Sequence, residues 1–192
     1  MIILNSTESK ESRIKRVDMH KYFLDRIKKS MEEKNYITAS WLIYSCFENR
    51  YFRTVQKVRE YCAYCRSKSK CNHKRKNELS IKTKIKCLQR LHENSADCIS
   101  GPFRYELFQE TIDWVEYRNT LMHDLLVLDD YEETDDMFKT CAENGLKLLN
   151  ETYNSCTKFR RKFYDPKYKF EFPKAAMDGC PCRPKPKEKP ED

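Results

Sequence analysis

Apolar residues recur along this chain at intervals of three and four, the spacing of one face of an α-helix. The strongest pattern runs from Leu107 to Leu128. Its two apolar rows contain Phe108, Ile112, Val115, Met122 and Leu126, and Leu107, Trp114, Leu121 and Leu125. Similar patterns predict helices over residues 8–34, 38–60 and 80–93, with Thr38 as an N-cap, and a last helix from Thr134 to Asp165.

Residues that break helices are scarce. The 192 residues include 3 Gly and 7 Pro, and no Pro occurs before Pro102. A β-protein would need turn residues about every ten positions, and these are absent. We therefore predict an all-α bundle of about five helices in one domain, residues 1–165. The Pro- and Lys-rich residues 166–192 are predicted to form a disordered tail.

The hexapeptide Arg118-Asn119-Thr120-Leu121-Met122-His123 interrupts the apolar pattern of residues 107–128. Arg118 and Asn119 fill positions where the pattern requires apolar side chains. A buried arginine is costly without a partner, so its presence indicates either a partner or a function. His123 follows Asn119 by one helical turn and lies on the same side of the helix. A cation, an amide and an imidazole at one face are suited to phosphate binding with acid–base chemistry.

The spacing Arg118-Asn119-x-x-x-His123 resembles the Arg-polar-x-x-x-His motif of ribonucleases in the HEPN superfamily. The resemblance extends as a pattern of helices over residues 8–163. It implies that two subunits line one cleft, that Arg118 binds the scissile phosphate and that His123 transfers protons. It also implies a 2′,3′-cyclic phosphate product, no catalytic metal, and a place in toxin–antitoxin, abortive-infection or antiviral systems with an antitoxin or defence partner.

The same resemblance implies a polar residue on the second helix that faces the motif. Glu48 lies among aromatic residues there and is the candidate catalytic partner of Arg118, with Ser45 and Asn49 as alternatives. A surface position for Glu48 is equally compatible with the pattern. The chain departs from one toxin subgroup, in which a tyrosine follows the histidine by two positions, because Leu125 occupies that position here.

A Cys- and His-rich segment, residues 61–77, separates the second predicted helix from the third. Its spacing suits a closed tetrahedral zinc site formed by Cys62, Cys65, Cys71 and His73. The alternative is a loop with reduced thiols that binds no metal. Cys180 and Cys182 form a weaker pair, which we assign to the unstructured tail.

Charge is distributed unevenly around a formal net charge of +8. Residues 66–90 are strongly basic, whereas residues 124–136 contain acidic residues and no Lys or Arg. The basic residues of the insert predicted to contact RNA are Lys68, Lys70, Lys74, Arg75 and Lys76. A solvated basic surface without a ligand is the alternative interpretation.

Neither a secretory signal nor a membrane-spanning segment is evident in the sequence. We therefore expect a cytoplasmic protein whose ten cysteines are reduced. The favoured function is a metal-independent endoribonuclease, active as a homodimer. One alternative is a module that binds RNA without cutting it, and another is a zinc-stabilised subunit for protein interaction. In a purely structural alternative, Arg118 pairs with Glu48 or Glu116 and His123 has no role.

Overall fold

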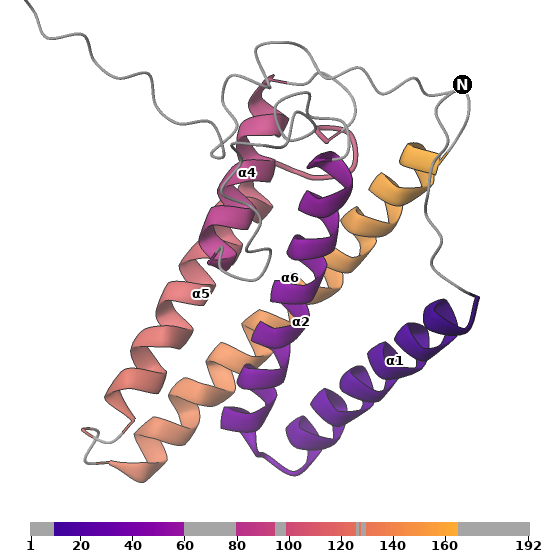
Figure 1. The fold of residues 1–192 in the computed structure, drawn as a ribbon. Coiled ribbons are helices and arrows are strands. Elements are labelled where there is room, and N and C mark those ends of the chain that lie inside the picture. Colours follow the sequence, from indigo (N-terminus) through magenta and orange to yellow (C-terminus); the bar gives the residue numbers. More distant parts are fainter. Residues whose placement is uncertain (1–9, 60–79, 95–98, 126, 128–129, 165–192) are drawn as a thin grey trace, which may run out of the picture.

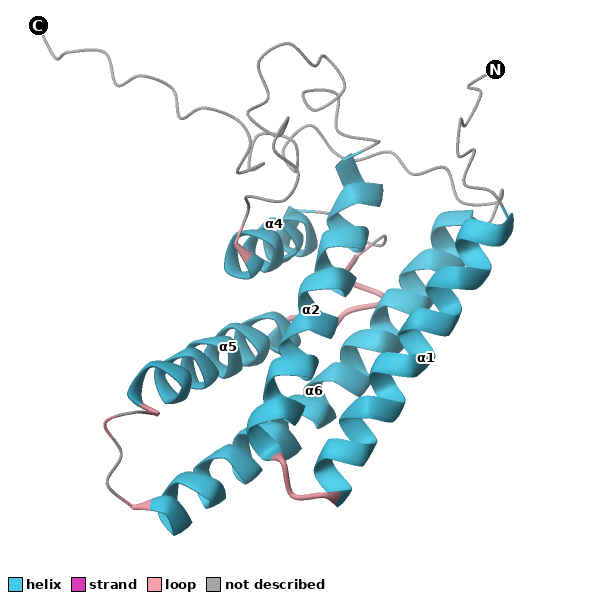
Figure 2. Cartoon of the chain, turned by 60° about the horizontal axis from the view of Figure 1, so that its bottom comes forward, coloured by secondary structure: helices cyan, strands magenta, loops and turns pink. Residues whose placement is uncertain are grey.

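Five helices and no strand make up the part of the chain that the computed structural model describes, residues 10–59, 80–94, 99–125, 127 and 130–164 (Figure 2). The helices are α1 (Lys10–Glu32), α2 (Tyr36–Arg59), α4 (Ile81–Asn94), α5 (Glu106–Asp124) and α6 (Tyr131–Tyr164). The predicted all-α bundle is confirmed. None of these helices combines the length and apolar character needed to cross a membrane.

Helices α2 and α6 form the central pair of the bundle and run in the same direction, with α5 antiparallel to both (Figure 1). The fully buried Tyr51 of α2 fixes their register, because its hydroxyl lies 3.2 Å from Thr111 Oγ1 on α5 and 3.5 Å from Thr152 Oγ1 on α6. Helix α1 packs on α2, and α4 packs on both α2 and α5. The predicted inner face of α4 is buried, and its members are Ile81, Ile85, Leu88 and Leu91.

Two helices begin earlier than the sequence predicts. Helix α2 starts at Tyr36 rather than Thr38, because the Asn35 side chain accepts a hydrogen bond from the Thr38 amide at 3.1 Å. Helix α6 starts at Tyr131 rather than Thr134, because Asp130 Oδ1 accepts hydrogen bonds from the amides of the two residues after Tyr131. In both cases a side chain preceding the helix satisfies its first free amides.

Two large apolar residues of these helices are exposed. Val17 of α1 is 54% exposed and Trp41 of α2 is 55% exposed. Helix α1 packs through its C-terminal half, where Ile27 is buried and Leu24 and Met31 lie against the core. Trp41 and Leu42 are neighbours on α2, and only Leu42 lies on the side that faces the other helices.

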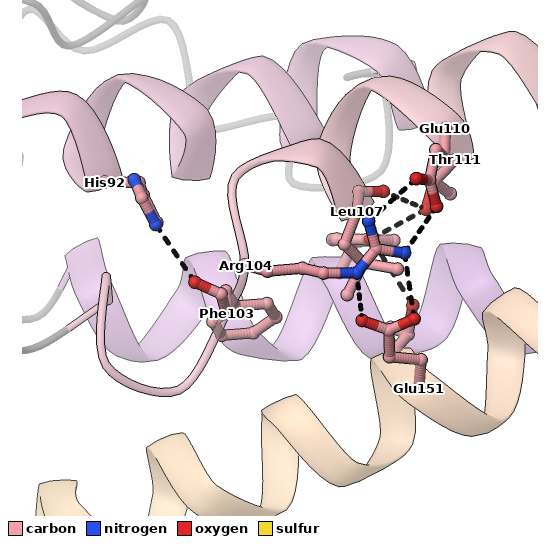
Figure 3. A network of polar contacts seen from close by, with 9 residues as sticks. His92, Phe103, Arg104, Leu107, Glu110, Thr111 and Glu151 are labelled. Atoms are coloured by element: carbon pink, nitrogen blue, oxygen red, sulfur yellow. Dashed lines mark hydrogen bonds and ion pairs between the residues drawn. The ribbon is translucent and has the colours of Figure 1, made fainter.

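The connection between α4 and α5 is held by polar contacts, shown in Figure 3. Arg104 donates to Glu110 at the start of α5 at 2.7 Å and to Glu151 on α6 at 3.0 Å. The Nε2 atom of His92 donates to the carbonyl oxygen of Phe103 at 3.0 Å. These contacts fix the start of α5, and therefore the direction in which it runs toward Arg118.

A polar cluster joins α1 to α2 and α6. The Nε2 atom of His20 lies 2.6 Å from an Arg50 nitrogen, and its Nδ1 lies 2.8 Å from the Tyr153 hydroxyl. The guanidinium of Arg50 also lies over the Tyr153 ring, 3.9 Å from its centroid. We call these three residues the His20 cluster. Burial and the nearby charges of Arg50, Arg160 and Arg53 lower the pKa of His20 to about 4.

The packing of α5 against α6 depends on Gly145. The indole of Trp114 lies against it, and the indole N–H donates to the carbonyl oxygen of Cys141 at 2.8 Å. A β-carbon added at Gly145 would lie 2.5 Å from Cζ2 of this buried ring. Such a distance requires the ring to move away from its hydrogen-bond partner.

We expect Gly145→Ala to lower the free energy of unfolding by about 1–3 kcal/mol, because overpacking outweighs the better helix propensity of alanine. Chemical denaturation followed by circular dichroism measures the effect. Gly101→Ala is the matched control, since Gly101 is exposed and lies between helices. Equal stability of the two variants would contradict the close contact at Gly145.

The low pKa of His20 predicts a pH-dependent stability. The unfolded chain binds a proton near pH 6.5 and the folded chain only near pH 4, so stability is lost as pH falls between these values. Because the ring is partly exposed, we expect wild type to lose roughly 1 kcal/mol more than His20→Gln between pH 7 and about pH 5. Urea unfolding of both proteins at both pH values measures this difference in the free energy of unfolding. Parallel losses in the two proteins would show that His20 protonates freely in the folded state.

Candidate functional site

Arg118 is buried where the C-terminal half of α5 approaches α2 and α6. It is 8% exposed, and its guanidinium carbon lies 4.9 Å from the centroid of the Tyr44 ring on α2. Its Nη1 donates to Asn119 Oδ1 at 3.1 Å, and its fully buried Nε has no hydrogen-bond partner. A buried donor without an acceptor costs about 1–3 kcal/mol, so this guanidinium is held in an unsatisfied state.

Burial and neighbouring groups act in opposite directions on the ionisation of this site. Burial lowers the pKa of Arg118, while Tyr44 and Cys141 raise it. The pKa of Tyr44 is raised by burial and by Glu48, against an opposing effect of Arg118. Arginine has a high enough intrinsic pKa to remain charged in such surroundings. The site therefore contains a desolvated positive charge over an aromatic ring.

Neither carboxylate considered as a partner of Arg118 is paired with it. Glu48 accepts a hydrogen bond from Lys84 of α4 at 3.1 Å, and Glu116 pairs with Lys82 of the same helix. In the structure Glu48 is therefore paired with Lys84 rather than with Arg118, and the alternative pair of Arg118 with Glu116 is not formed either. The reason is that α4 packs on both α2 and α5, which places Lys84 beside Glu48 and Lys82 beside Glu116. Within the described residues Arg118 has no carboxylate partner.

The other two motif residues are more accessible than Arg118. Asn119 is half-buried and bonded to Arg118, whereas His123 is exposed in the last turn of α5. In the described part of the chain no hydrogen bond or ion pair engages His123. Helix α5 ends at Asp124 rather than Leu128, so His123 lies at the helix end. The structure thus brings Arg118 and Asn119 together and leaves the imidazole open to solvent.

Several residues predicted to form sites lie outside the described residues. They are the zinc ligands Cys62, Cys65, Cys71 and His73, the basic residues Lys68, Lys70, Lys74, Arg75 and Lys76, and Cys180 and Cys182 of the tail. Among the residues that are described, no group of three or more His, Cys, Asp or Glu side chains is arranged to hold a metal ion.

Sequence reasoning missed two residues that define the site. The contact of Tyr44 with Arg118 does not follow from the apolar pattern of α2. Lys84 was counted as part of a basic segment, yet it is 3% exposed and its ammonium lies 5.5 Å from the centroid of the Phe52 ring. Its position among Ile81, Ile85 and Leu88 on an apolar helix face was a signal for burial.

Comparison with known proteins adds no relative. No family model, no curated protein and no solved structure matches this chain.

The Glu48–Lys84 pair generates a stability prediction. Glu48→Gln leaves the buried Lys84 ammonium without its carboxylate, and we expect a loss of about 1–3 kcal/mol in the free energy of unfolding. Glu116→Gln is the matched control, because its pair with Lys82 is exposed and contributes at most about 1 kcal/mol. Adding Lys84→Met to Glu48→Gln removes the buried charge and should restore most of the loss. Equal effects of the two glutamine variants in urea unfolding would contradict a stabilising role of Glu48 at the buried Lys84 ammonium.

Proposed function

We propose that this protein is an endoribonuclease of the HEPN type, with Arg118 binding the scissile phosphate and His123 moving protons. The observation that carries the proposal is the unsatisfied guanidinium of Arg118, buried beside Asn119 and without a carboxylate among the described residues. A phosphate supplies the negative charge that this group lacks. The Arg-Asn-x-x-x-His pattern supports the same assignment.

The reaction follows from the properties of these side chains. Attack of the 2′-hydroxyl on the adjacent phosphorus needs a base, and departure of the 5′-oxygen needs an acid. Imidazole serves either role near neutral pH, and His123 is exposed and therefore within reach of a substrate. Arg118 would stabilise the charge that accumulates on the phosphate oxygens, and Asn119 would orient the guanidinium through its existing hydrogen bond.

One copy of the motif supplies one imidazole, so the proposal includes a homodimer in which two motifs face one RNA strand. The exposed Trp41 supports this part. It precedes Tyr44 by about one turn on α2, close to the Arg118 contact, and it is 55% exposed. A large aromatic side chain at this position is suited to burial against a second subunit.

A binding function without cleavage has one observation in its favour. Arg118 is buried against Tyr44, whereas His123 is exposed and forms no hydrogen bond with either Arg118 or Asn119. Such a site would hold a phosphate without delivering a proton to it. In that case His123→Ala would leave both RNA affinity and RNA integrity unchanged.

RNA cleavage by wild type, Arg118→Lys and His123→Ala tests the proposal. We expect both substitutions to lower the cleavage rate at least about 100-fold, because lysine lacks the planar fork and alanine lacks the proton carrier. Products should carry 2′,3′-cyclic phosphates, with and without EDTA. Arg26→Ala, an exposed arginine on α1, is the control and should cleave like wild type.

Circular dichroism of each variant separates loss of activity from loss of folding. Arg118→Lys retains the charge and most of the side-chain volume, so it is the informative variant if Arg118→Ala unfolds. Intact RNA with all proteins over a broad panel of substrates would refute the nuclease function. Cleavage by wild type that survives in His123→Ala would refute the role of His123.

A further inference from the structure

The His20 cluster lies on a different side of α2 from the Arg118 site. Tyr44 of α2 faces Arg118 on α5, whereas Arg50 of α2 contacts residues of α1 and α6. Along α6, Cys141 beside Arg118 and Cys156 beside Arg50 are separated by about 20 Å at the helical rise per residue. The cluster is thus a separate group of polar side chains that the proposed catalytic chemistry does not use.

The hydrogen bonds of the cluster leave one donor hydrogen without an acceptor among the described residues. Arginine only donates, so the Nε2 atom of His20 must accept from Arg50. In the neutral imidazole the proton then resides on Nδ1, which donates to the Tyr153 hydroxyl oxygen. The hydroxyl hydrogen of Tyr153 is therefore available to another acceptor, and no described residue accepts it.

Positive charge at the cluster exceeds what the described residues neutralise. Burial, together with the nearby charges of Arg160 and Arg53, lowers the pKa of Arg50 to about 10. Neither Arg50 nor Arg160 forms an ion pair with a described carboxylate. Arg50 donates to His20, and Arg160 makes a single 3.5 Å contact with the carbonyl oxygen of Cys156. An anion would relieve this repulsion and accept the free Tyr153 hydrogen.

The basic residues continue along the C-terminal part of α6. Arg160 follows Tyr153 by about two turns of α6, so the two lie on nearly the same side of the helix, and Arg161 next to it is also exposed. A single phosphate needs fewer donors than this surface offers, whereas a chain of phosphates can contact several at once. The extent of the surface therefore favours a polymer over a free nucleotide.

We propose that the His20 cluster and Arg160 form a second RNA contact, which binds the phosphate backbone of a single strand outside the cleavage site. Arg50 and Arg160 supply the charge, and Tyr153 supplies a hydroxyl donor held in position by His20. The identity of the polymer as RNA rests on the proposed function, whereas the affinity for phosphate backbone rests on the cluster alone.

Binding of a fluorescent single-stranded 2′-O-methyl RNA, which cannot be cleaved through its 2′-oxygen, tests this contact in the full chain. We expect Arg160→Gln and Arg50→Gln to raise the Kd about five- to tenfold each at low salt. The slope of log Kd against log salt concentration should fall by about one unit for each phosphate contact that is lost. Tyr153→Phe removes only the hydroxyl and should raise the Kd about two- to fivefold. Arg26→Gln is the charge-matched control and should bind like wild type.

Arg160→Gln decides the outcome if Arg50→Gln unfolds, because Arg160 is exposed. Equal binding by Arg160→Gln, Tyr153→Phe and Arg26→Gln would overturn the proposal. Tight binding of a nucleoside monophosphate that depends on Arg160 would also overturn it, in favour of a mononucleotide site. If the cluster variants lose RNA affinity while wild type cuts no RNA, the second RNA contact is supported and the nuclease function is refuted. If wild type cuts RNA and the cluster variants bind RNA normally, the nuclease function is supported and the second RNA contact is refuted.

Discussion

The buried hydroxyl of Tyr51 sets the geometry on which both polar sites depend. It lies between Thr111 on α5 and Thr152 on α6, so one side chain fixes the relative positions of three helices. A fully buried hydroxyl must find such partners, and a shift of either helix would leave it unsatisfied. Tyr44 lies two turns before Tyr51 on α2, and Arg50 lies beside it. The same register therefore brings Tyr44 to Arg118 and Arg50 to Tyr153.

Two buried cations, Lys84 and Arg118, occupy similar surroundings but differ in whether a described carboxylate pairs with them. Lys84 and Arg118 are 3% and 8% exposed, and each lies near an aromatic ring of α2. Lys84 has a carboxylate in Glu48, which makes its burial tolerable. The described residues provide no such group for Arg118, although Glu48 is close enough to influence Tyr44. Selection for stability alone would favour a partner or an apolar residue at position 118.

The sequence predicted the helices well because burial repeats with the helical period. Ile81, Ile85 and Leu88 are buried as expected. The helix starts were less predictable, since Asn35 and Asp130 act through side-chain bonds to the backbone that are independent of apolar spacing. At the candidate site, the pattern predicted that Arg118 occupies an inward position. It did not predict the partner of Glu48. A long side chain can reach several residues, and which of them lie nearby depends on how separate helices pack.

The arginines of the bundle differ in whether they have carboxylate partners. Arg104 meets two carboxylates at an exposed position, where the network orders a connection between helices. Arg118, Arg50 and Arg160 meet none among the described residues. Since 30 acidic residues are present in the chain, this segregation does not follow from composition. Arg118 is buried and Arg50 half-buried, so these two carry a desolvation cost that an exposed cation avoids. Within the described residues, the sites of Arg118 and Arg50 are the two places where we assign phosphate.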